Sequence, residues 1–352
     1  SCRWCRVKFF NVLATYVSPH LGRFVVQGNS SEELRPDASV FQDTVLGPPL
    51  WNTFFSNVSE PASSCGGDEA MFADDLNVFQ KFPCQAPLAE CQESMDRCKD
   101  RVHRWGRVNR VTFDAAKEHF IVLHPSESHG ETFKLLGCLV DVDLRMLSAV
   151  EQVLSKIRPK ITAILRTRPY YEVPDLIYQF KTQIWGLIET NMAGYFHAVP
   201  SLLVKIDNAQ NSFLRELGMT PVDAFMEFNF APPSLRRNVG ILGLLHKRVL
   251  GKCHPMFERL FPWLSSRFPN FRTHGHTKQL YGHWSEIMSH TSLYYRSIFA
   301  MCDIYNNLPQ NVVDADSISE FQHMLMDMVR ERCTNNDDAW ASSFCRNVDL
   351  DS

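Results

Sequence analysis

The chain has 352 residues, of which 45% are hydrophobic and 21% are charged, and its formal net charge is -3. This composition is typical of folded globular proteins and excludes wholesale disorder, while the length allows two or three packed subdomains. The sequence has no apolar run of about eighteen residues or more, so no membrane span is expected. The first residues contain no apolar segment followed by a cleavage site, which favours an intracellular protein, nuclear or cytoplasmic, over a secreted one.

The N-terminal part is predicted to mix short helices and strands. Residues 6–17 are apolar enough for a short helix, residues 23–28 and 39–41 favour strands, and a polar turn separates these strands. A helix is predicted to begin at Gly47, because the prolines that follow are tolerated in a first helical turn. Since the chain begins with Ser1 and not with methionine, we expect a fragment or an incomplete gene model.

The most informative segment is residues 70–79, in which two adjacent carboxylates separate two short apolar runs. Such runs on either side of an Asp-rich turn predict a β-hairpin with Asp74 and Asp75 at its tip. Neighbouring carboxylates repel, so holding them on one turn is costly unless a cation neutralises them. Mg²⁺, or Mn²⁺ in its place, is the expected ion, because Mg²⁺ prefers oxygen ligands and takes phosphates as further partners. An Asp pair alone is common in surface turns, so this interpretation depends on the surrounding motifs.

A long helix is predicted to follow, because apolar side chains recur at spacings of three and four over residues 88–105. Cys84, Cys91 and Cys98 recur every seven residues and are expected to be buried thiols on one stripe. Cys2 and Cys5 form the only close cysteine pair, which favours reduced thiols over a zinc site. Residues 121–123 and 134–136 return to strand character. Helices and hairpins alternating on one antiparallel sheet indicate an α+β arrangement.

From residue 149 onward the pattern predicts helix after helix. Apolar stripes and helical stretches fall within residues 150–165, 176–187, 203–217, 234–250 and 318–329, with a break at 307–309. Basic residues crowd two segments, namely Arg97, Lys99, Arg101, Arg104, Arg107 and Arg110, and then Lys156, Arg158, Lys160, Arg166 and Arg168. The last fifty residues are acidic instead. Such asymmetry allows a phosphate-binding channel on a nearly neutral protein, although solvated helix faces explain either cluster equally well.

Four motifs in one order resemble a known family. Residues 41–52 precede the aromatic-Ala-Asp-Asp hairpin at Phe72, and a segment with Trp105, Asn109 and Lys117 follows it. A second hairpin-like segment containing Gly137 comes next. This succession resembles the palm of the reverse transcriptases of non-LTR (LINE-type) retrotransposons. The resemblance implies a partial fingers and palm at residues 1–147, a helical thumb at 148–220 and a C-terminal helical region at 221–352.

The resemblance also implies a two-metal RNA-directed DNA polymerase that binds an RNA template, a DNA primer and deoxynucleoside triphosphates. Asp74 would be the chief metal ligand and Asp75 its neighbour, with Phe72 near the primer terminus and Lys117 near the triphosphate. Gln42, Asp43 and Gly47 fall in the segment that lies near the template and nucleotide. Leu136 and Gly137 match the hairpin that grips the primer.

Two departures from the family pattern predict that this chain is inactive as it stands. The family carries a further metal-binding carboxylate on an earlier strand, and no residue before Phe41 supplies it, since Asp37 lies too close to the Gln motif. Asp43 stands where the family has glycine, and its charge and bulk should repel a triphosphate. The expectation is a polymerase segment that begins after the first catalytic strand.

Two other functions stay open at this stage. The chain could be a non-catalytic nucleic-acid-binding remnant that keeps a basic helical surface, for which salt-dependent RNA binding without nucleotide incorporation is expected. It could also be a different Mg²⁺-dependent phosphoesterase, in which case Asp68 and Glu69 are the candidates to join Asp74 and Asp75. The oligomeric state and the RNA that would be copied are not indicated by the sequence.

Overall fold

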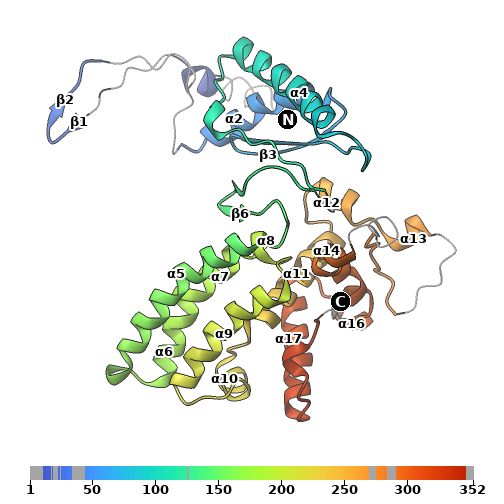
Figure 1. The fold of residues 1–352 in the computed structure, drawn as a ribbon. Helices are drawn as coiled ribbons and strands as arrows, with labels where there is room; N and C mark the ends of the chain where they lie inside the picture. Colours follow the sequence, from blue (N-terminus) through green and yellow to red (C-terminus); the bar gives the residue numbers. More distant parts are fainter. Residues whose placement is uncertain are drawn as a thin grey trace. The chain divides into compact units, whose positions relative to one another are not determined.

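The computed structural model describes residues 11–16, 18, 23, 25–33, 44–124, 127–268, 275–283 and 291–345. The chain forms two compact units, unit 1 (Ser1–Phe120) and unit 2 (Ile121–Ser352) (Figure 1). Both units combine helices with small antiparallel sheets, as expected of an α+β fold. Within the described residues there are three two-stranded sheets in place of the single sheet predicted, because each hairpin pairs only with itself. The division at residues 147 and 220, with its palm and thumb, stays a prediction.

Unit 1 carries the acidic hairpin. Its described elements are a helical segment at residues 11–16, β1 (Val25–Val26), β2 (Asn29–Ser30), α2 (Gly47–Phe55), η1 (Ser56–Val58), α3 (Ser59–Ser63), β3 (Asp68–Phe72), β4 (Asp75–Phe79), α4 (Leu88–Asn109) and η2 (Ala115–Lys117). The predicted helix start at Gly47, the hairpin and the long helix are confirmed. The strand predicted at 23–28 is confined to β1, and the one predicted at 39–41 lies outside the described residues.

The core of unit 1 joins α2, η1, α3 and α4 to one face of the hairpin. Its fully buried members are Phe55, Val58, Ala62 and Val102, and the partly buried residues around them are Trp51, Leu76, Val78, Trp105 and Phe113. Cys91 and Cys98 are buried on α4 as predicted, but Cys84 is exposed. The reason is that α4 begins only after Pro87, so Cys84 precedes the helix and cannot belong to its stripe.

Unit 2 is predominantly helical. Its described elements are β5 (Phe133–Leu135), β6 (Cys138–Val140), α5 (Leu147–Arg166), η3 (Arg168–Tyr170), α6 (Val173–Phe180), the π-helical turn η4 (Lys181–Trp185), α7 (Gly186–Thr190), α8 (Met192–Tyr195), α9 (Pro200–Glu216), α10 (Pro221–Phe228), α11 (Pro233–Val249), α12 (Pro255–Leu260), α13 (Leu264–Arg267), α14 (Thr291–Arg296), η6 (Ile298–Ala300), α15 (Met301–Asn306), α16 (Gln310–Val313), α17 (Ile318–Thr334) and η7 (Trp340–Ser342). The strand predicted at 121–123 is only an isolated bridge between Val122 and His129.

Two hydrophobic clusters hold unit 2 together. The first is centred on α5, where Val150, Val153 and Ile157 are buried as the sequence stripe predicted. The second is built on α11 and α17 and includes Leu242 and Phe321. Figure 1 shows α5, α6 and α9 side by side. No helix among the described residues has both the length and the apolar character that crossing a bilayer requires.

Candidate active site on the acidic hairpin

The acidic pair lies at the tip of the hairpin formed by β3 and β4. Phe72 and Asp75 form the last cross-strand pair, so Ala73 and Asp74 make a two-residue loop. Ala73 has a φ of 54°, in the left-handed region that tight hairpin loops demand at their first position. The side chains of Asp74 and Asp75 are both exposed. The local sequence pattern therefore produces the predicted hairpin, whose turn presents two neighbouring, exposed carboxylates.

A hydrogen bond ties this tip to helix α2. The indole Nε1 of Trp51 donates to the carbonyl oxygen of Ala73 at 2.9 Å. The Trp51 ring stacks on Phe55, with 5.1 Å between the ring centroids and 16° between the planes. Phe55 is in turn one of the buried residues of the core. The segment that begins at Gly47 thus anchors the tip to the interior of unit 1.

The two faces of the hairpin differ in character, because side chains alternate along a strand. Leu76 and Val78 of β4 point into the core. Asp75 alternates with them and therefore lies on the other face, across from Phe72 in the ladder. Phe72 is 64% exposed. An exposed aromatic ring beside a carboxylate is an arrangement that can contact a nucleotide, through stacking on the ring and ion coordination at the acid.

The acidic pair supplies two carboxylates, fewer than a two-metal site needs. Mg²⁺ is commonly held by one or two carboxylates together with waters and substrate phosphates. Across the described ranges there is no group of three or more His, Cys, Asp or Glu side chains placed to hold a metal. Asp68 pairs with Phe79 at the opposite end of the ladder, and Glu69 accepts a hydrogen bond from Ser59. Neither of these acids joins the tip.

Lys117 is held out toward solvent by its neighbours. Asp114 caps the short helix η2 by accepting a hydrogen bond from the amide of Ala116 at 3.1 Å. Glu118 pairs with Lys99 and with His103 of α4. The Lys117 side chain is 83% exposed, and its Nζ lies 3.6 Å from the Asp114 carboxylate. In the described part of the chain no hydrogen bond or ion pair joins Lys117 to the hairpin acids.

Glu118 is the residue of this loop that sequence reasoning missed. Burial raises the pKa of its carboxyl, but hydrogen bonds and charges from Lys99 and His103 outweigh burial and bring the pKa below its ordinary value. The hydrogen bond to Glu118 raises the pKa of Lys99. Both partners are charged at neutral pH, so Glu118 fastens the loop to α4, while Lys117 stays exposed beside Asp114. The only sequence signal was the acid directly after Lys117.

The other predicted site residues are divided between the units. Gln42 and Asp43 lie outside the described residues. Gly47 is buried as the first residue of α2. In unit 2, Leu136 and Gly137 form the two-residue loop between β5 and β6, with φ values of 48° and 87°. Two successive positive φ values define a type I′ hairpin turn, in which Gly is favoured, so this predicted hairpin is confirmed.

Besides the acidic hairpin of unit 1, unit 2 carries a surface that is basic and aromatic. The five cations of the α5 segment, Lys156, Arg158, Lys160, Arg166 and Arg168, are exposed and have no ion-pair partner within the described residues. Directly after them, Tyr170 is 83% exposed, and Tyr178 on α6 is 68% exposed. On α4, by contrast, Arg97 pairs with Glu93 and Lys99 with Glu118. Arg104 and Arg107 of α4 are also exposed and have no ion-pair partner within the described residues. The α5 segment differs in that none of its five cations is paired, which the sequence did not show.

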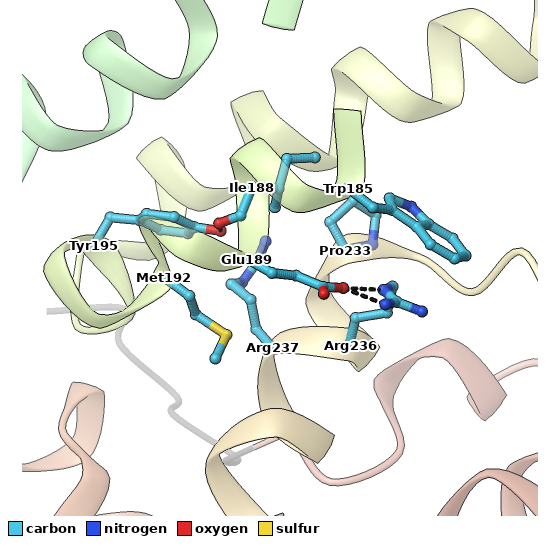
Figure 2. A pocket seen from close by; sticks show the side chains of 8 residues that line it. All are labelled: Trp185, Ile188, Glu189, Met192, Tyr195, Pro233, Arg236 and Arg237. Carbon is cyan, nitrogen blue, oxygen red and sulfur yellow. Dashed lines mark hydrogen bonds and ion pairs between the residues drawn. The ribbon is translucent and has the colours of Figure 1, made fainter. Parts of the chain in front are cut away.

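A small hollow in unit 2 contains none of the predicted site residues. Figure 2 shows Arg236 and Glu189 joined by hydrogen bonds beside the ring of Trp185. The Arg236 guanidinium lies 3.6 Å from the centroid of that ring, and its Nε donates to Glu189 at 2.6 Å. The neutralised and stacked cation contributes to packing between α7 and α11.

Comparison of the chain with protein-family models, with curated proteins and with solved structures gives no match. Any assignment of function therefore depends on the residues and geometry described above.

Proposed function

We propose that the chain derives from the RNA-directed DNA polymerase of a non-LTR retrotransposon. The observation that carries this proposal is the hairpin tip, on which Asp74 and Asp75 are presented beside exposed Phe72. The motif order in the sequence adds to it, since the segment before the hairpin supports the tip through Trp51. The partners of such a protein are an RNA template, a DNA primer and deoxynucleoside triphosphates.

Within this proposal each residue has a defined task. Asp74 is the chief ligand of Mg²⁺ or Mn²⁺ and Asp75 its support. The bound ion would neutralise phosphate charge during nucleotidyl transfer. Phe72 packs against the primer end, and exposed Lys117 donates hydrogen bonds to the triphosphate. Leu136 and Gly137 contact the primer strand through their exposed turn.

We further propose that the chain by itself does not catalyse polymerisation. A two-metal mechanism needs more carboxylates than the hairpin provides, and no third acid joins the pair within the described residues. Asp43 adds a negative charge where a triphosphate would approach. A separate segment bearing the missing carboxylate would be needed for activity.

Primer extension tests the proposed inactivity. The purified chain is given a primed RNA template, deoxynucleoside triphosphates and Mg²⁺ or Mn²⁺, and no incorporation is expected. Robust incorporation that disappears in Asp74→Ala would overturn the proposed inactivity while supporting the polymerase origin. The origin itself is tested by Mn²⁺ titration of the full chain, followed by paramagnetic NMR broadening. Broadening centred on Asp74 and Asp75 and lost in Asp74→Asn supports a metal-binding hairpin, and unchanged resonances there contradict it.

A second candidate function is non-catalytic binding of nucleic acid. The observation that favours it is the run of unneutralised cations on α5 followed by exposed Tyr170 and Tyr178. Lys and Arg contact phosphates, and aromatic rings stack on bases, in sequence-tolerant single-strand binding.

The test is fluorescence anisotropy with a labelled single-stranded RNA at several salt concentrations. Affinity should fall steeply with salt, and Arg168→Ala combined with Tyr170→Ala should weaken binding by about tenfold or more. Arg97→Ala is the matched control, because Glu93 already neutralises that cation. Equal affinity for all variants would exclude this surface.

A further inference from the structure

The short segment between α3 and β3 is fastened to helix α4 from two sides. Arg101 donates through Nη1 to the carbonyl oxygen of Ser64 at 3.1 Å and to its hydroxyl at 2.8 Å. Gln80 donates through Nε2 to the carbonyl oxygen of Cys65 at 2.9 Å. Ser94 of α4 donates to Gln80 Oε1 at 3.0 Å. Since Ser94 and Arg101 lie on one face of α4, the backbone of Cys65 is held against that face.

Cys98 lies on the same face, between those two anchors. The two sulfur atoms approach successive carbonyls of α3: Cys65 Sγ lies 3.8 Å from the oxygen of Pro61, and Cys98 Sγ lies 3.5 Å from that of Ala62. The two thiols therefore converge on one end of α3 from different parts of the chain.

We propose that Cys65 and Cys98 are a dithiol that hydroperoxides convert reversibly into an intramolecular disulfide. In the first step the Cys65 thiolate attacks one oxygen of hydrogen peroxide, giving a sulfenic acid and, after protonation of the leaving oxygen, water. In the second step the Cys98 sulfur attacks the Cys65 sulfur, the S–S bond forms, and the hydroxyl leaves as water with the Cys98 proton. Two thiols and one peroxide thus yield one disulfide and two waters.

The environments of the two thiols assign these roles. Cys65 is partly exposed, so peroxide can reach it. Cys98 is 2% exposed. Burial, together with the hydrogen bond to Cys65, raises the pKa of the Cys98 thiol to about 12. A buried thiol that stays protonated is a poor nucleophile toward peroxide in solution, but it is already in place to resolve a sulfenic acid on Cys65.

The disulfide would act on the hairpin without touching its acids. Residue 65 precedes β3, which begins at Asp68, so the bond would fix the entry to the hairpin on α4. This inference does not depend on the proposed polymerase function.

The experiment is a peptide map of the full chain, reduced first and then treated with graded hydrogen peroxide. Remaining thiols are alkylated, and the protein is digested with trypsin without reduction. The map is unambiguous because Cys65 is the only cysteine in peptide 24–81 and Cys98 the only one in peptide 98–99. We expect these two peptides to appear cross-linked in monomeric protein, at peroxide concentrations several-fold lower than any other thiol pair, and to separate with dithiothreitol.

Variants separate this pair from general oxidation. In Cys98→Ser, the Cys65 sulfenic acid should accumulate and be trapped by dimedone. In Cys91→Ser, which removes a buried thiol elsewhere on α4, the cross-link should form as before. The proposal is overturned if Cys65 pairs chiefly with exposed Cys84 or Cys345, or remains alkylatable after those thiols are oxidised. The wild-type map decides this even if a variant fails to fold.

Discussion

The indole nitrogen of Trp51 donates a hydrogen bond of 2.9 Å to the carbonyl oxygen of Ala73, the first residue of the acidic loop. The two residues belong to sequence motifs that are separate along the chain. Their contact fixes the hairpin tip relative to α2, so the orientation of Asp74 and Asp75 depends on the core of unit 1 as well as on the turn. A tryptophan suits this position because its ring packs on Phe55 while its N–H needs an acceptor.

Trp51→Phe should loosen the hairpin tip. The substitution keeps an aromatic ring but removes the donor, so we expect unit 1 to lose about 1 kcal/mol of unfolding free energy. Amide hydrogen exchange at Asp74 and Asp75 should accelerate by the factor that corresponds to this free-energy loss. Urea unfolding and exchange mass spectrometry measure the two effects. Thr53→Val, on the solvent side of α2, is the control and should leave the exchange of the tip unchanged; an equal effect of both variants would contradict the role of the indole.

Ala73→Gly should stabilise the hairpin. An L-residue in the left-handed region costs about 1–2 kcal/mol, whereas glycine in a turn costs about 0.5–1 kcal/mol of additional chain entropy. The expected net gain is therefore about 0.5–1 kcal/mol in urea unfolding. Ala70→Gly, in the middle of β3, is the matched control and should destabilise, since glycine weakens a strand interior. A loss of stability in Ala73→Gly would mean that the loop strain is absent.

The helices and hairpins around the site could be predicted from the sequence where the residues that determine them are close together in the chain. The start of α2 follows from Gly47 and its prolines, and both hairpins follow from turn residues between apolar runs. Contacts between distant segments left no such signal. The Trp51 hydrogen bond and the approach of the Cys65 and Cys98 thiols to α3 depend on how α2, α3 and α4 pack together.

The expectations that the structure did not bear out also have physical causes. The seven-residue spacing of cysteines suggested a stripe that included Cys84, but spacing alone does not reveal that Pro87 delays the start of α4. Strand propensity suggested one sheet, yet propensity does not determine which edge pairs with which, and each hairpin closed on itself. Charge counting missed the pairing of Lys99 with Glu118, because that contact joins α4 to a residue beyond its end, whereas the pairing of Arg97 with Glu93 follows from their i,i+4 spacing on one helix.

Arg237 and Asp207 form an ion pair inside unit 2 whose disruption should be costly. Nη1 and Nη2 of Arg237 donate to the two carboxylate oxygens of Asp207, each at 3.0 Å, and Arg237 is 5% exposed. Arg237→Met leaves a poorly solvated carboxylate without its partner, so we expect a loss of about 3–5 kcal/mol. The double variant Arg237→Met with Asp207→Leu should recover much of it. Thermal unfolding of both proteins measures the difference; equal instability of the two would show that the charge is not the cause.

Two buried histidines in unit 2 are held in their neutral form. His246 Nε2 lies 3.0 Å from the carbonyl oxygen of Ala315, so it carries the proton, and Nδ1 accepts from the Tyr305 hydroxyl at 3.0 Å. His276 Nε2 donates to the carbonyl oxygen of Tyr305 at 2.9 Å, and its Nδ1 accepts from the amide of Lys278 at 3.0 Å. Burial lowers the pKa of both rings. Protonation of Nδ1 would break the hydrogen bond from the Lys278 amide to His276, and would require the Tyr305 hydroxyl to turn and accept from His246.

Unit 2 should therefore lose stability as the pH falls below the pKa of an unfolded histidine, about 6.5. A folded-state pKa below that value means that the unfolded chain binds more protons, so the contribution of each ring is complete above about pH 6.5 and is lost on acidification. Each ring can contribute at most about 1.4 kcal/mol to this loss per pH unit, and the loss ends once the pH falls below its folded-state pKa. Urea unfolding at a series of pH values measures this slope, which His246→Gln should reduce by about half. His323→Gln removes an exposed histidine and should leave the slope unchanged; a slope that responds equally to both substitutions would place the acid sensitivity elsewhere.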